Sequence, residues 1–147
     1  MSAFNSIPSR MQANAINPQS FVRCVALSLE SAAPDLWRVL RELAVEVEDV
    51  NTLVVSLRAQ SHYLSMDASR QLNGAGEAAM CRAAADVVNG WLRLSCGSSP
   101  FRNPETTEEL EDLAASFDRH LKHHWRAACT RAWSQASPPS LREIRAA

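Results

Sequence analysis

The longest regular pattern of apolar residues in the chain runs from Leu36 to Leu64. Apolar side chains recur there at alternating steps of four and three, and Ser61 is the one polar member of the series. This spacing is typical of one face of an amphipathic helix and continues for about four heptads. The positions are Leu36, Leu40, Leu43, Val47, Val50, Val54, Leu57, Ser61 and Leu64. We therefore expect one long helix, whose apolar stripe either fills the core or pairs with a partner helix.

A β-hairpin is the alternative for part of this segment. Residues 43–48 and 53–57 are rich in Val and Leu, and a turn around Asp49, Val50 and Asn51 would join them as strands. That turn lacks Gly, and the helical period passes through it without a change of phase. The pattern therefore favours the helix over the hairpin.

Three other segments repeat their apolar residues with the helical period. Two of them follow an Asn-Pro pair, which is typical of a helix N-cap followed by a first-turn proline. The predicted helices are a short one from Asn17-Pro18 to before Pro34, a long one between a linker at 73–76 and a cap at Gly97, and a long one from Asn103-Pro104 to before Pro138.

The positions of Gly and Pro support an all-α fold. The chain has 4 Gly and 7 Pro, with neither between Pro34 and Gly74 nor between Pro104 and Pro138. An all-β domain needs turn residues far more often than this. We expect a single-domain helical bundle of about four helices, one short and three long. Its predicted parts are a flexible polar leader at 1–17, the bundle at 18–136 and a tail at 137–147.

Composition and charge exclude several classes of protein. The chain has 147 residues, 46% of them hydrophobic and 21% charged, and its formal net charge is −1. The apolar content is too high for intrinsic disorder, and no apolar run is long enough to span a membrane. A nearly neutral chain is also a poor match for nucleic acid or an anionic membrane surface. We expect a soluble domain, with nucleic acid an unlikely partner and the membrane excluded as one.

The strongest candidate for metal chemistry is a pair of histidines in the last predicted helix. His120 and His124 are four residues apart, so they lie one turn apart on the same face and could chelate a transition metal. Cys129 or His62 could complete such a site. Nearby basic residues would repel a cation, however, so the pattern favours a solvated basic face and no cofactor; these residues are Arg119, Lys122 and Arg126.

The four cysteines do not form a metal-binding or redox motif. No Cys-x-x-Cys pair occurs among Cys24, Cys81, Cys96 and Cys129. Neither a G-x-S-x-G elbow nor a phosphate-binding G-x-x-x-x-G-K loop is present. We therefore expect reduced, structural thiols and lean toward a non-enzymatic protein.

The aromatic residues of the helices suggest a binding role. Trp37 and Trp133 lie off the apolar stripes, where an aromatic side chain can anchor a partner protein. The candidate partner-binding residues are Trp37, Trp125, Arg126 and Trp133. We expect a helical protein-protein interaction module, such as a bacterial adaptor, regulator or secreted effector, that binds another protein or a second copy of itself. A metal-binding bundle and a nucleic-acid-binding regulator are the alternatives.

The N-terminal residues bear on location. No Asp or Glu precedes Glu30, and Ser, Asn and Gln are frequent. Such leaders occur in organelle transit peptides and in proteins exported without cleavage, although the basic residues are few for a presequence. We expect a cytoplasmic protein, with secretion through a non-cleaved leader as the alternative.

Overall fold

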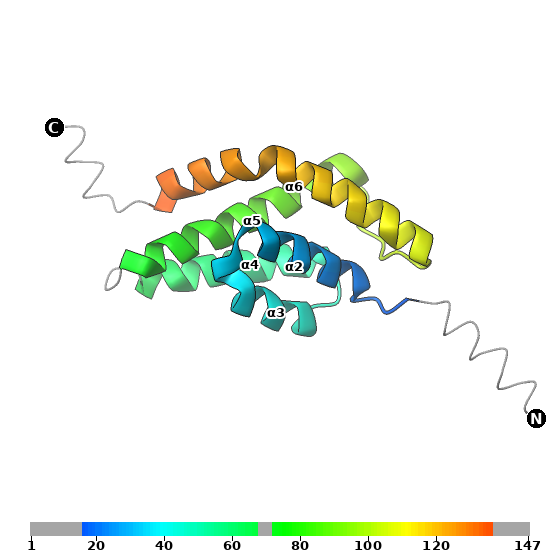
Figure 1. Ribbon diagram of the computed structural model, residues 1–147, viewed down its shortest axis with the longest axis horizontal. Helices are drawn as coiled ribbons and strands as arrows, with labels where there is room; N and C mark the ends of the chain where they lie inside the picture. The colour runs from blue at the N-terminus through cyan, green and yellow to red at the C-terminus, as the bar shows by residue number, and fades with distance from the viewer. Residues whose placement is uncertain (1–15, 68–71, 137–147) are drawn as a thin grey trace, which may run out of the picture.

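The computed structural model describes residues 16–67 and 72–136, and all of their regular structure is helical (Figure 1). It confirms the all-α fold class, and because these residues form no strand, the hairpin alternative is wrong. The described residues hold five helices, whereas about four were expected. They are α2 (Ser20–Ala32), α3 (Trp37–Glu46), α4 (Val50–Asp67), α5 (Leu72–Cys96) and α6 (Thr107–Ala136), with a 3-10 turn η1 (Pro34–Leu36) before α3. Most of the predicted leader and the whole predicted tail lie outside the described residues.

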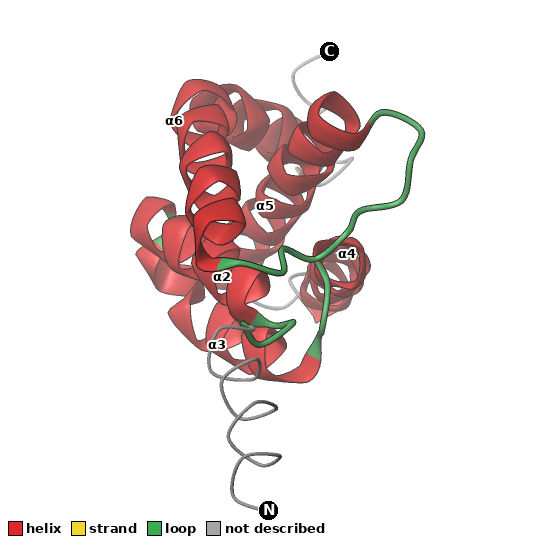
Figure 2. Ribbon diagram, turned by 90° about the vertical axis from the view of Figure 1, so that its right-hand side faces the viewer, coloured by secondary structure: helices red, strands yellow, loops and turns green. Residues whose placement is uncertain are grey.

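Helix α5 lies at the centre of the packing. Helix α4 packs along one side of it and α6 along another, and both run antiparallel to it (Figure 1). Helix α2 packs on α6 and α3, so that α2 and α3 close the core on the side away from α4 (Figure 2). No helix in the described part of the chain is long and apolar enough to cross a membrane.

The prediction of one helix from Leu36 to Leu64 is wrong, because the chain breaks between α3 and α4. Val47 adopts an extended conformation, with φ −102° and ψ 145°. Asp49 then caps α4, since its Oδ1 accepts hydrogen bonds from the backbone N–H of Thr52 at 2.9 Å and from the Thr52 hydroxyl at 3.2 Å. The apolar stripe nevertheless continues through the break, because Val47 and Val50 are both buried.

Side chains from distant segments stabilise this break. The Gln19 side-chain amide donates hydrogen bonds to the carbonyl oxygens of Val45 at 2.8 Å and Val47 at 3.2 Å. The Asn103 amide donates to the Glu48 carbonyl at 3.4 Å. Carbonyls at the end of a helix have no partner within it, so these contacts satisfy groups that a continuous helix would have satisfied internally.

An aromatic cluster joins three helices and the loop before α6. Phe21 of α2 lies 5.3 Å from Trp91 of α5 and 5.4 Å from Phe101 of the loop, measured between ring centroids. Phe117 of α6 meets Trp91 edge to face at 6.0 Å. The Trp91 indole N–H donates to the Ser116 hydroxyl at 3.0 Å, so the buried ring has its polar atom satisfied.

The sequence predicts one end of the loop between α5 and α6 correctly and the other end wrongly. Gly97 has φ +60° and its N–H donates to the Arg93 carbonyl, which confirms it as the C-terminal cap of α5. The predicted start of the last helix at Asn103-Pro104 is wrong. Thr106 is the cap instead, because its hydroxyl accepts from the Glu109 N–H at 3.1 Å.

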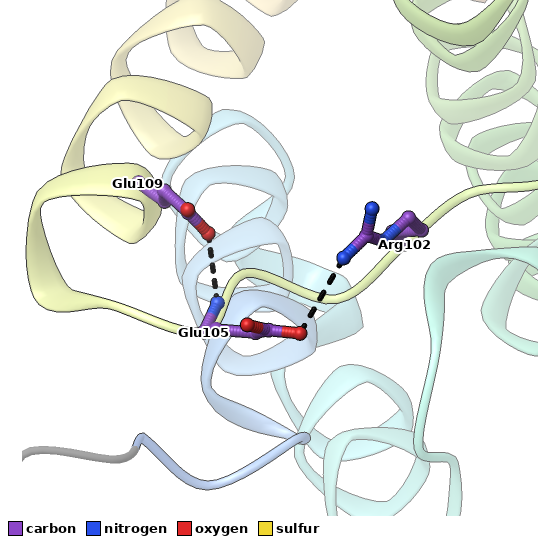
Figure 3. A network of polar contacts seen from close by, with 3 residues as sticks. All are labelled: Arg102, Glu105 and Glu109. Atoms are coloured by element: carbon purple, nitrogen blue, oxygen red, sulfur yellow. Dashed lines mark hydrogen bonds and ion pairs between the residues drawn. The ribbon is translucent and has the colours of Figure 1, made fainter.

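Glu109 also reaches back before the helix. Its carboxylate accepts from the Glu105 N–H at 2.9 Å, and the Glu105 carboxylate pairs with Arg102 at 3.5 Å (Figure 3). A Thr with a Glu three residues later resembles a capping box, which starts α6 directly after Thr106 and not at the proline.

The predicted linker at 73–76 is also wrong, since these residues lie within α5. Packing on α4 supports this early part of the helix: Ala78 and Ala79 are buried, and the Ser61 hydroxyl of α4 donates to the Ala78 carbonyl at 2.7 Å. Tertiary packing of this kind offsets the low helix propensity of Gly.

Candidate functional site

The apolar stripe that the sequence singled out is part of the core of a single chain. Leu43 and Leu64 are half-buried, and the other seven positions are buried, namely Leu36, Leu40, Val47, Val50, Val54, Leu57 and Ser61. The stripe therefore packs against helices of its own chain. It offers no exposed seam for a partner helix.

An exposed apolar surface lies where α2 meets η1 and α3. Leu27 and Trp37 have 64% and 43% of their surface exposed. Together with Pro34 they line an open hollow of about 420 Å³, and the remaining lining residues are Glu30 and Ser31. We call this group of five residues the Trp37 surface.

The local fold explains why Trp37 is left outside. Leu36 is 1% exposed and points into the core from the last position of η1. Because neighbouring residues of a helix point in different directions, Trp37 at the start of α3 is turned away from the interior. Pro34 occupies the first position of η1, where its fixed φ suits a helix start and directs the chain from α2 into α3.

Charged side chains border the Trp37 surface. The guanidinium carbons of Arg38 and Arg41 lie 5.3 Å and 5.1 Å from the centre of the Trp37 ring. Arg41 also pairs with Glu30 of α2 at 3.1 Å. Cation–π contacts at exposed sites contribute about 0.5–1 kcal/mol each and favour this orientation of the indole. The ion pair joins the two helices that carry the surface.

The structure does not bring the four predicted partner-binding residues into one site. Trp125, Arg126 and Trp133 belong to α6, whereas Trp37 lies on α3, which packs chiefly on α2. On α6, Arg126 and Trp133 are exposed and two turns apart on the same face. Trp125 is half-buried and packs against the core.

The predicted histidine pair forms a close cluster on α6. The rings of His120 and His124 lie 4.3 Å apart and those of His123 and His124 lie 5.0 Å apart, measured between centroids. The His120 ring packs against α5 at Gly90. A Cβ added to Gly90 would lie 3.5 Å from the Nε2 atom of His120, which is ordinary van der Waals contact. Burial lowers the pKa of His120, the neighbouring His124 lowers it further, and a hydrogen bond with the backbone of Val87 acts in the opposite direction.

His120 and His124 supply two adjacent nitrogen ligands. In the part of the chain that the structure describes, no group of three His, Cys, Asp or Glu side chains could hold a metal ion. Cys129 and His62, which the sequence offered as further ligands, do not complete the pair. The metal-binding alternative therefore stays a prediction that depends on His120 and His124 alone.

A second hollow lies between α4 and α5, and sequence reasoning missed it. Its volume is about 290 Å³, and every residue that lines it is polar: Arg58, Ser61, His62, Ser65, Arg82 and Asp86. We call it the α4–α5 hollow. Arg58 and His62, like Arg82 and Asp86, are four residues apart and could have been recognised as helical pairs. That the two pairs face each other depends on how α4 packs on α5, which the sequence pattern does not indicate.

The comparisons with known proteins assign no family to this arrangement of helices. No family model matches the chain, and neither a curated protein nor a solved structure matches it significantly.

Proposed function

We propose that the protein is a non-enzymatic helical interaction module that binds another protein through the Trp37 surface. The observation that carries this proposal is an exposed tryptophan that lies beside two arginines and lines an open hollow. Trp and Arg are enriched among the residues that contribute most to protein-protein binding, and this surface has one Trp with two Arg beside it.

The arrangement has the parts expected of an interface. Leu27, Pro34 and Trp37 supply an apolar centre, and Glu30 with Arg41 supplies a charged border. An apolar side chain of the partner would enter the hollow and remove the exposed faces of Leu27 and Trp37 from water. The surrounding charges would orient the partner and add specificity.

Affinity capture with matched variants tests the proposal. The full chain would be immobilised and exposed to an extract of its source cells, beside Trp37→Ala and Trp133→Ala. We expect one captured protein whose amount falls at least about tenfold for Trp37→Ala, the loss that is typical of an anchoring tryptophan. Trp133→Ala should leave the capture unchanged, and an equal loss from both variants would contradict the proposal.

Self-association is distinguished in the same experiment. If the partner is a second copy of this chain, sedimentation of the purified protein will show a dimer that Trp37→Ala dissociates. A dimer that Trp37→Ala leaves intact, with no other protein captured, would place the interface elsewhere and refute the role of the Trp37 surface.

A further inference from the structure

The α4–α5 hollow collects positive charge from two helices. Arg58, His62 and Ser65 follow each other at intervals of one turn on α4, so their side chains lie on one face. Arg82 and Asp86 are likewise one turn apart on α5. The hydrogen bond from Ser61 to the Ala78 carbonyl fixes the two helices against each other beside these residues.

The charges in the hollow do not cancel. The Arg58 guanidinium lies 3.9 Å from the Asp86 carboxylate, which is a long ion pair, and 52% of the Arg58 side chain is exposed. Arg82 makes no ion pair or hydrogen bond with any residue that the structure describes. Because Asp86 is the one acid among the six lining residues, the hollow carries a net positive charge.

The hydrogen-bonding groups favour an oxyanion with several acceptor oxygens. Each guanidinium offers five N–H donors, and His62 and Ser65 add an imidazole and a hydroxyl. The Ser61 hydroxyl already donates to Ala78, so its oxygen is left as an acceptor. A carboxylate has two oxygens and a single charge, whereas a phosphate monoester has three terminal oxygens and nearly two charges, which suits donors that approach from two helices.

We propose that the α4–α5 hollow binds a small hydroxylated phosphate ester, with Arg58 and Arg82 on its phosphate. The Asp86 carboxylate accepts a hydrogen bond from a hydroxyl group of the same ligand, which gives the one acid of the hollow a role in selection. A volume of about 290 Å³ lies just below the usual range for small-molecule sites, so we expect a ligand no larger than a sugar phosphate. This site is separate from the Trp37 surface and does not depend on its function.

A titration followed by amide NMR tests the site directly. Glucose 6-phosphate would be added to the full chain, with inorganic phosphate and succinate as comparisons. We expect saturable one-to-one binding with shifts centred on residues 58–65 and 82–86, tightest for glucose 6-phosphate and weakest for succinate. Absence of saturation, shifts centred on the basic residues of α6, or equally tight succinate binding would overturn the proposal.

Two matched variants separate a built site from general charge attraction. Arg82→Gln should weaken glucose 6-phosphate binding at least about tenfold, because it removes a charged donor. Arg119→Gln makes the same change of charge on exposed α6 and should alter the affinity less than about twofold. An equal loss of affinity in both variants would show that the anion binds through the net charge of the protein and not in the hollow, and would overturn the proposal.

Asp86→Asn supplies a test in which the expected result is tighter binding, which a misfolded protein would not show. Removing the carboxylate should tighten binding of inorganic phosphate severalfold, because a repelling charge is lost. It should also reduce the preference for glucose 6-phosphate over inorganic phosphate, because the acceptor for the ligand hydroxyl is weakened. Weaker binding of both probes by the same factor would refute the role given to Asp86.

Discussion

His120 is the residue whose protonation bears most directly on the packing of α6 against α5. Burial and the nearby His124 lower its pKa below the ordinary value of 6.5, so the folded protein disfavours the charged imidazole. The unfolded chain then binds the proton more readily than the folded one. The stabilising effect of neutral His120 is therefore complete above pH 6.5 and is lost as the pH falls below that value.

The lowered pKa of His120 predicts how the stability of the protein depends on pH. The free energy of unfolding should decrease on acidification below about pH 6.5, and His120→Gln should make that decrease smaller. Urea denaturation at a series of pH values measures it, with His123→Gln as the exposed control. A pH profile that His120→Gln leaves unchanged would show that this imidazole has the same pKa in both states.

Cys81 is the second residue with a clear expectation. It is fully buried, and burial, helped by the charge of Glu77, raises its thiol pKa to about 12. Since the thiolate is the reactive form, Cys81 should react with iodoacetamide only when the protein unfolds. Cys24, Cys96 and Cys129 are half-buried and should be modified earlier in the native protein, as mass spectrometry of timed samples would show. Modification of Cys81 at the same rate as these three would contradict the packing of α5.

At the scale of the elements, the apolar pattern predicts the buried faces of α3 and α4 but not the break between them. The apolar stripe correctly indicates the buried faces of both helices, because Val47 and Val50 keep their place in it across the turn. The local signal for the break is Asp49 with Thr52 three residues later, an N-cap that the regular period concealed. The contacts from Gln19 and Asn103 are long-range and could not be read from the neighbouring residues.

The cap leads to a prediction for α4. Asp49→Ala should lower the free energy of unfolding by about 1 kcal/mol, because the first turn of α4 loses the acceptor for the Thr52 N–H. Chemical denaturation would measure the loss. Glu48→Ala removes the same charge from the exposed neighbouring side chain and should cost less than about 0.5 kcal/mol. Equal effects from the two variants would mean that charge alone, and not capping, stabilises this end of the helix.

The sequence likewise predicts only part of the Trp37 surface and nothing of the α4–α5 hollow. Trp37 was recognised from sequence because it lies off the apolar stripe, and it is indeed exposed. Its neighbours Leu27 and Pro34 come from α2 and η1, and only the packing of these elements brings them to the ring. The α4–α5 hollow was not predicted, because Arg58 lies 24 residues before Arg82 in the chain and only the packing of α4 on α5 brings their charges together.

At the scale of the whole molecule, the stripe is enclosed by its own chain, and this determines how stability depends on concentration. Leu57 is fully buried, so Leu57→Ala should lower the free energy of unfolding by about 2–5 kcal/mol. The melting temperatures of the wild type and the variant should both be constant over about a hundredfold range of protein concentration in calorimetry. A midpoint that rises with concentration even in Trp37→Ala, where the Trp37 surface is removed, would show that folding needs a second chain and that the stripe is completed by a partner.

The central claim is that the Trp37 surface contacts another protein, and site-specific photo-crosslinking tests it most directly. A photoreactive phenylalanine derivative would replace Leu27, which is 64% exposed on this surface, or Val55, which is 65% exposed on α4, as a matched control. In an extract of the source cells, illumination should join one defined protein to position 27, and Trp37→Ala in the same chain should abolish that product. The same product from position 55, or none from position 27, would contradict the claim.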